Sequence, residues 1–156
     1  MTVSAATPEA VSDCVRASGD AGISCAAAAT CGHVHLDLRP MRQVRFYQPG
    51  DLTVGADAGL TVAALNAVLA GHGQFVPLDV ADPERITLGA VLARHLSGPL
   101  RQRYGTVRDF VLGLEMVNAE GGRVRCGGTV VKNVAGYDWM KLMIGARGAL
   151  GIITGV

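Results

Sequence analysis

The 156-residue chain lacks a strong excess of charge, a long apolar run and an export signal. Its formal net charge is only +1, which gives no electrostatic reason to expect nucleic acid or an anionic membrane as a partner. No apolar stretch approaches the length needed to cross a bilayer, and the chain does not open on a basic region followed by an apolar one. These absences predict a cytoplasmic protein with no transmembrane segment.

The common catalytic and nucleotide-binding motifs are missing as well. The patterns GxxxxGKS/T, HExxH and GxSxG do not occur, and neither does the GxGxxG pattern of the Rossmann fold. The four cysteines form no CxxC pair, so we expect free thiols. Cys25, Cys31, His33 and His35 are zinc-type donors, but their spacing fits no common zinc pattern, and alternating positions are ordinary in a strand. We predict no metal site.

Glycine is what the chain has in quantity, with 21 residues in 156. Apolar residues make up 49% of the chain and charged residues 17%, which is typical of a globular protein and not of a disordered one. The length is sufficient for one domain with a real core. High glycine content favours tight turns and loops that contact a ligand over a helix bundle.

Local patterns predict alternating helices and strands. One helix begins after Thr7 and stops at Gly19, and another begins after Thr61 and stops at Gly71. The apolar face that we expect the second helix to bury consists of Val62, Leu65, Val68 and Leu69. Strands are expected at residues 23–27, 34–38, 44–47 and 52–58, and a hairpin from strands at 110–118 and 123–126.

The most informative stretch runs from Thr129 to Thr154. It contains the sequence KNVAGYD at residues 132–138, then three glycines spaced by three, and it ends in an Ile-Ile-Thr strand. Glycines at this spacing make a poor helix, because each costs about 1 kcal/mol relative to alanine. They suit a backbone with positive φ or one that a ligand approaches closely. A loop that only packs on the core has the same pattern, so the spacing alone leaves both interpretations open.

The motifs of this stretch resemble those of PCMH-type FAD-binding domains, the vanillyl-alcohol-oxidase-like flavoproteins. Residues 132–138 are the most specific part, and the chain is most similar to the FAD-binding E subunits of bacterial glycolate oxidases. The resemblance covers about Asp37 to Thr154. Further segments agree with the family in order and spacing, namely 51–54, 58–65, 77–79, 87–90, 97–99 and 103–109.

The resemblance implies an α+β fold of two α/β lobes with FAD between them. Residues 1–50 would form a small N-terminal lobe and residues 51–156 the second lobe, without the C-terminal substrate domain of the relatives. The implied function is an FAD-binding module or subunit of a flavin-dependent 2-hydroxy-acid dehydrogenase or oxidase of the glycolate type, working with partner subunits. We find no credible catalytic base, so we do not expect activity from this chain alone. The alternative is a degenerate, non-catalytic paralogue or fragment that serves as a scaffold or interaction subunit.

The resemblance also implies which residues contact the cofactor. These are Ala28, Ala29, Thr30, Pro77, Leu78, Thr87, Leu88, Gly89, Ala90, Arg94, His95, Ser97, Gly98, Tyr104, Gly105, Gly148, Gly151, Ile152 and Ile153.

The chain departs from the family pattern at two of these places. Relatives have a glycine-rich phosphate loop where this chain has four alanines at 26–29, and alanine at positive φ is strained by roughly 1 kcal/mol or more. Either Thr30 and Gly32 hold the phosphates in an altered loop, or FAD binds weakly or not at all. Arg94 and His95 replace a threonine and an asparagine, and they either pair with phosphate or face solvent. Three further arginines follow within residues 101–108, and they either attract an anionic substrate or phosphate or face solvent.

Overall fold

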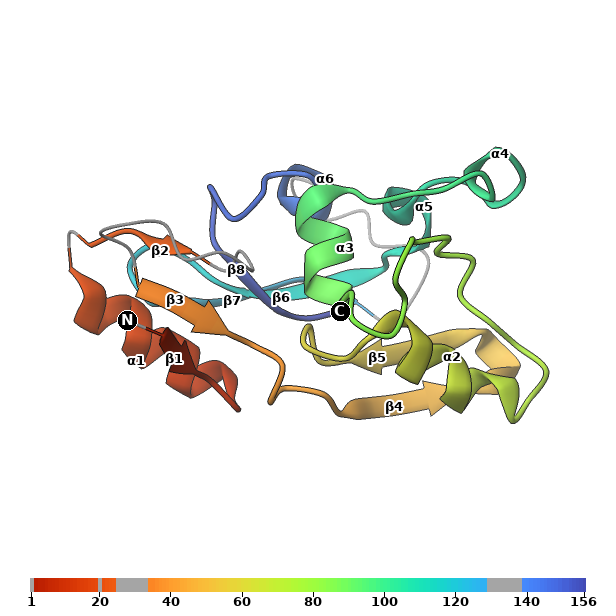
Figure 1. Ribbon diagram of the computed structural model, residues 1–156, viewed down its shortest axis with the longest axis horizontal. Helices are drawn as coiled ribbons and strands as arrows, with labels where there is room; N and C mark the ends of the chain where they lie inside the picture. The colour runs from red at the N-terminus through yellow and green to blue at the C-terminus, as the bar shows by residue number, and fades with distance from the viewer. Residues whose placement is uncertain (1, 20, 25–33, 129–138) are drawn as a thin grey trace.

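The computed structural model describes residues 2–19, 21–24, 34–128 and 139–156 (Figure 1). The first lobe contains β1 (Thr2–Ser4), α1 (Pro8–Ser18), β2 (Ile23–Ser24) and β3 (Val34–Asp37). Beyond these come β4 (Val44–Gln48), the 3-10 turn η1 (Pro49–Asp51), β5 (Thr53–Ala56), α2 (Val62–Ala70), α3 (Leu88–Arg94), α4 (Arg101–Tyr104), α5 (Val107–Phe110), β6 (Gly113–Val117), β7 (Arg123–Gly127), α6 (Trp139–Met143) and β8 (Ile152–Gly155).

The first lobe is a parallel sheet in the order β1-β3-β2 with α1 packed against it. The helix starts where the sequence predicts, because the Thr7 side chain accepts a hydrogen bond from the backbone N–H of Ala10 at 3.2 Å. It stops at Gly19, which has a φ of +52°. Val11 and Val15 of α1 are buried against Leu36 of β3. The predicted helix and the strand that follows at Val34 are therefore confirmed.

The second lobe is an antiparallel sheet. β4 pairs with β5, and β6 pairs with both β7 and β8. Two hydrogen bonds between Ala56 and Val156, of 2.7 and 2.9 Å, join the two groups of strands edge to edge. The strand order of the second sheet is thus β4-β5-β8-β6-β7. Because β4 belongs to this sheet, the chain passes from the first sheet to the second between Asp37 and Val44.

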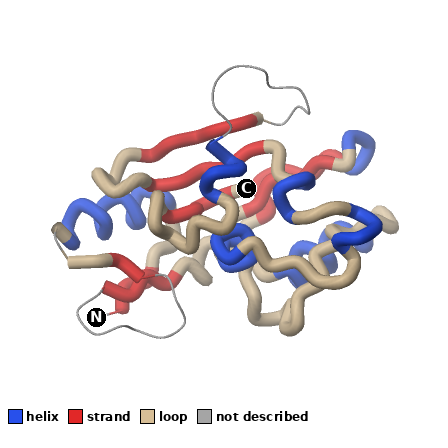
Figure 2. The backbone as a smooth tube through the Cα atoms, turned by 90° about the horizontal axis from the view of Figure 1, so that it is seen from above, coloured by secondary structure: helices blue, strands red, loops and turns tan. Residues whose placement is uncertain are grey.

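Helices cover one face of the second sheet. Leu65 and Leu69 of α2, and Val91 and Leu92 of α3, are buried in a cluster that includes Leu114, Met116 and Ile153 of the strands. A smaller cluster joins the lobes, because Val117 and Ile152 of the second sheet pack with Val11 and Val15 of α1. Figure 2 shows α1 at one end of the molecule and the other helices at its centre and opposite end.

Two local expectations are wrong, and helix α3 was not expected. This helix starts at Leu88, with Thr87 as its N-cap. Phe110 belongs to α5, which a reciprocal pair of hydrogen bonds between Thr106 and Asp109 caps, so the strand begins only at Gly113. Val68 is 44% exposed, because the buried face of α2 is narrower than expected and consists of Val62, Leu65 and Leu69.

Candidate cofactor site

The glycine loop, residues 144–151, connects α6 to β8. Its three glycines have φ values of +90° at Gly145, +86° at Gly148 and +149° at Gly151, which confirms the expectation of positive φ. A methyl group at Gly148 would have no heavy atom of the described residues within 4 Å, whereas one at Gly151 would lie 2.7 Å from the carbonyl oxygen of Val117. Gly151 is therefore required by packing, while Gly148 is exposed and opens onto free space.

The loop runs between the two lobes. At one end, the backbone N–H groups of Gly145 and Arg147 donate to the carbonyls of Leu92 and Ala93 at the end of α3, at 3.0 and 2.8 Å. The bond to Ala93 satisfies a carbonyl that the last turn of a helix leaves free, while the carbonyl of Leu92 also accepts from the N–H of His95. At the other end, Ile152 is buried in the cluster that contains α1 and β3. In Figure 1 the loop (blue) crosses the view between α3 and the first lobe.

His95 lies beside this loop in an unusual conformation. It follows α3 with a left-handed φ of +52°, and Arg147 on the loop has a similar φ of +54°. Such angles are uncommon in residues other than glycine and gather at functional sites. The Nε2 atom of His95 is buried and has no hydrogen-bond partner in the part of the chain that the structure describes. Buried polar atoms rarely remain unpaired, so a polar ligand is one way to complete this environment.

Other expected contact residues dock α3 against the sheet. The backbone N–H of Gly89 donates to the carbonyl of Ala58 at 2.7 Å, and a methyl group at Gly89 would lie 3.1 Å from that same oxygen. The side chain of Leu88 is 4% exposed and packs in the core. Ala90 donates its N–H to the Thr87 cap. Ile152 and Ile153 also direct their side chains into the cores, so a ligand at β8 can reach only backbone groups.

A separate surface follows α3. A hollow of about 440 Å³ is lined by Ser97, Gly98, Pro99, Arg101 and Gln102. A methyl group at Gly98 would lie 2.6 Å from Oδ2 of Asp79, so this glycine allows two chain segments to touch. Tyr104 is 40% exposed and meets Phe75 edge-on at 5.9 Å.

The expected contact residues therefore fall into two neighbouring regions and one part not described. Gly105 has a φ of +91° and ends α4, and Pro77 and Leu78 are half-buried beside the core. Ala28, Ala29 and Thr30 lie outside the described residues, as does the KNVAGYD motif at 132–138.

Cys25, Cys31 and His33 also lie outside the described residues. The described residues contain no group of three histidine, cysteine or acidic side chains that could hold a metal ion. In the same described ranges, no helix is long and apolar enough to span a bilayer.

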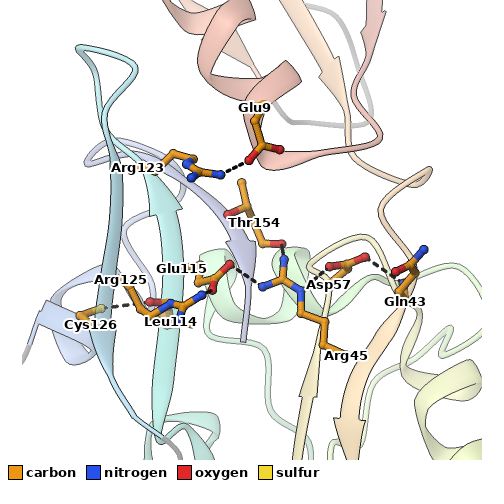
Figure 3. A network of polar contacts seen from close by, with 10 residues as sticks. All are labelled: Glu9, Gln43, Arg45, Asp57, Leu114, Glu115, Arg123, Arg125, Cys126 and Thr154. Carbon is orange, nitrogen blue, oxygen red and sulfur yellow. Dashed lines mark hydrogen bonds and ion pairs between the residues drawn. The ribbon is translucent and has the colours of Figure 1, made fainter.

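A network of arginines and carboxylates, which the sequence did not reveal, crosses the second sheet (Figure 3). Arg45 of β4 forms an ion pair with Asp57 at 2.7 Å and another with Glu115 of β6, which also pairs with Arg125 of β7. Glu9 of α1 pairs with Arg123, linking the first lobe to the second. Partial burial raises the pKa of Glu115, but hydrogen bonds and charge from Arg45 and Arg125 outweigh burial and hold this pKa below its ordinary value. The network joins strands, and the lowered pKa of Glu115 is the opposite of the raised pKa that a catalytic acid needs.

Because the pKa of Glu115 is lowered in the folded state, the stability that this residue contributes should depend on pH. Its contribution is fully present above the unfolded-state pKa of about 4.5 and is lost as pH falls through the lower folded-state pKa. Glu115→Gln should therefore destabilise the domain by about 1 kcal/mol at pH 7 and by much less near pH 3. Chemical denaturation at both pH values measures this difference. Glu120→Gln, at an exposed turn, is the control, and an equal loss at both pH values would contradict the ion-pair account.

Comparison with known proteins identifies the fold. The sequence profile of the FAD binding domain family matches residues 1–127, four fifths of the chain. The chain belongs to this family. The match includes the first lobe and stops before the KNVAGYD motif at 132–138. The family is therefore recognised from the rest of the chain, without its most specific motif. The expectation of an FAD-binding domain is confirmed.

Two curated relatives and one solved structure illustrate the relationship. Glycolate oxidase subunit GlcE of Escherichia coli (strain K12) is 41% identical over 120 residues, which are 76% of this chain and 34% of that protein. The mitochondrial D-lactate dehydrogenase [cytochrome] of Arabidopsis thaliana is 37% identical over 123 residues, 79% of this chain and 21% of that protein. A structure of alkyldihydroxyacetonephosphate synthase superposes with a TM-score of 0.82 at 24% identity, covering 99% of this chain and 30% of that one. The chain thus spans about a third or less of these proteins, and the structural match establishes the α+β fold.

The described residues fit FAD as the cofactor of the family. The glycine loop is open at Gly148, it lies between the lobes, and it adjoins His95, whose buried Nε2 has no partner among the described residues. Backbone groups of the loop can approach a ligand closely because no side chain stands at Gly148. When bound, a flavin supplies an acceptor for hydride.

Proposed function

We propose that the chain is the FAD-binding part of a flavin-dependent oxidoreductase that acts on a small 2-hydroxy acid, together with partner subunits or a separate substrate domain. The observation that carries the proposal is the exposed glycine loop, which is anchored to α3 on one side and to the core of the first lobe on the other. The substrate class is supported by the names of the relatives, since glycolate and D-lactate are both 2-hydroxy acids.

In this proposal the chain positions the flavin, and the base comes from elsewhere. Oxidation of a hydroxy acid needs a base for the hydroxyl proton as well as a hydride acceptor. Asp109 is an acid near His95, but hydrogen bonds from the N–H and Oγ1 of Thr106, at 2.7 and 2.9 Å, hold its pKa below the ordinary value. An acid engaged in this way stabilises the start of α5 and is a poor proton acceptor. We therefore assign the base to the substrate domain or partner.

The proposal predicts that the purified chain retains FAD. After incubation with FAD and desalting, a visible flavin band should remain with the protein at one flavin per chain. Absorption spectroscopy with a protein assay measures this ratio, and circular dichroism checks that the protein is folded. A folded but colourless protein would overturn the proposal and favour the alternative of a scaffold that has lost its cofactor, for which the alanines at 26–29 are the sequence argument.

A further inference from the structure

The arginines of the described residues divide into two groups. One group pairs with carboxylates and consists of Arg16, Arg39, Arg45, Arg85, Arg123 and Arg125. The other group has no carboxylate partner within the described ranges and consists of Arg42, Arg94, Arg101, Arg103, Arg108 and Arg147. All of the second group except Arg42 lie on the segment 94–108 or on the glycine loop. Positive charge is therefore concentrated, without neutralising partners, on the part of the surface that adjoins the candidate site.

Three of these arginines lie on segments that meet at the start of the glycine loop. The backbone N–H of Arg147 donates to the carbonyl of Ala93, at 2.8 Å, and so brings the loop next to Arg94. Arg108 donates through Nη2 to the carbonyl of Ile144 at 2.9 Å and holds the start of the loop. A methyl group at Gly145 would lie 3.5 Å from Cβ of His95 and 3.9 Å from Nη2 of Arg108. The loop and the end of α3 are thus joined at the backbone, and Arg147 and Arg94 lie on the two joined segments.

At the end of α3 and on the glycine loop, Arg94 and Arg147 are available for a ligand, whereas the unpaired Arg101 lies on α4 beside the separate hollow. Arg94 and Arg147 are both exposed, neither side chain makes a hydrogen bond or ion pair with another described residue, and they come from the two segments that the 2.8 Å bond joins. Arg108 is engaged with Ile144, and Arg103 lies 5.6 Å from the centre of the Tyr104 ring. Apolar side chains flank the loop, since Leu142 is 54% and Leu150 44% exposed. A cationic pair beside exposed apolar groups suits a ligand with both anionic and aromatic parts.

We propose that Arg94 and Arg147 bind the diphosphate of a dinucleotide and thereby replace, in part, the grip of a glycine-rich phosphate loop. This inference rests on the proposed function for the identity of the dinucleotide as FAD. A guanidinium binds phosphate oxygens through two parallel N–H groups and stays charged at any accessible pH. Arg108 and His95 act as positioning residues, because they hold the loop and the end of α3 that carry the two arginines. The same chemistry would bind ADP or inorganic pyrophosphate.

The test compares ligands that share or lack the diphosphate. Calorimetry on the 156-residue chain would measure binding of FAD, ADP, pyrophosphate and riboflavin, which has no phosphate. Arg94→Gln and Arg147→Gln should each weaken FAD, ADP and pyrophosphate binding about tenfold, the effect of one charge-assisted hydrogen bond, and leave riboflavin unchanged. Arg42→Gln removes an equally exposed and unpaired charge outside the site and should leave all four affinities unchanged.

The outcomes separate this inference from the proposed function. If the native chain binds FAD and neither variant changes its affinity, the inference is wrong and the proposed function stands. If the native chain binds ADP and pyrophosphate through Arg94 and Arg147 but does not bind FAD, the diphosphate site stands and the flavin function fails. Equal losses for riboflavin and FAD would overturn the inference by indicating a general disturbance of the site. If the native chain binds none of FAD, ADP and pyrophosphate, the inference is also wrong. An acidic protein partner would then be the expected occupant of this surface.

Discussion

Replacing Gly148 with valine is expected to weaken FAD binding by roughly 100-fold, or about 3 kcal/mol, while the domain remains folded. Among the described residues, no heavy atom lies within 4 Å of a methyl group at this position, so the valine side chain would occupy the space over the exposed loop. The φ of +86° costs a β-branched residue about 1–2 kcal/mol in stability, which a domain of this size tolerates. Flavin titration, followed by fluorescence, measures the affinity.

Gly73→Val is the matched control for this variant. Gly73 follows α2 with a φ of +66°, and no heavy atom in the described part of the chain lies within 4 Å of a methyl group added there. The two variants therefore carry a similar backbone strain, and only Gly148 lies on the loop between the lobes. Equal flavin affinity in both variants would mean that the loop is an ordinary turn that packs on the core and does not contact the cofactor.

Replacing Gly59 with alanine is expected to destabilise the domain by about 3–5 kcal/mol, enough to unfold much of the protein. The added methyl group would overlap the carbonyl oxygens of both Leu38 and Met41, far inside contact distance. These oxygens belong to the connection between the two sheets, and the overlap is with backbone, which cannot rotate away as a side chain can. The loss would appear in the free energy of unfolding and in soluble yield.

Gly50→Ala provides the comparison for this effect. Gly50 lies in the exposed turn η1, where an added methyl group has no heavy atom within 4 Å, so its unfolding free energy should change by less than about 0.5 kcal/mol. Native-like stability of Gly59→Ala would show that the connection at Leu38–Met41 shifts freely, and that the close approach does not fix how the lobes meet.

Local chemistry was sufficient to predict the elements whose ends carry strong signals. Thr7 and Thr61 cap their helices through hydrogen bonds to residues only three positions away, at Ala10 and Ala64. The hairpin of β6 and β7 was recognisable from its glycine-rich turn, although its first strand begins later than expected. The start of α3 was missed, because a threonine followed by Leu-Gly-Ala is as typical of a turn as of a cap, and the contact of Gly89 with Ala58 spans 31 positions.

The candidate site was predicted in part for the same reason. Glycine spacing predicted positive φ at Gly145, Gly148 and Gly151, since few other residues adopt that conformation without strain. It did not distinguish the open position, Gly148, from the packed one, Gly151, because the difference depends on the carbonyl of Val117 in another strand. Arg147 carried no local signal at all. Its importance in the proposed diphosphate site follows from one hydrogen bond to Ala93, which lies 54 positions earlier.

The sequence by itself determined the family, the caps of the main helices and the glycine loop, because these depend on residue type and short-range spacing. Only the tertiary structure decided which charges are paired and which remain available. Arg45 and Arg125 meet Glu115 across the strands, while Arg94 and Arg147 meet no carboxylate in the described residues. The physical reason is that ion pairing depends on distances between side chains remote in sequence, and the strand order and the packing of α3 set those distances.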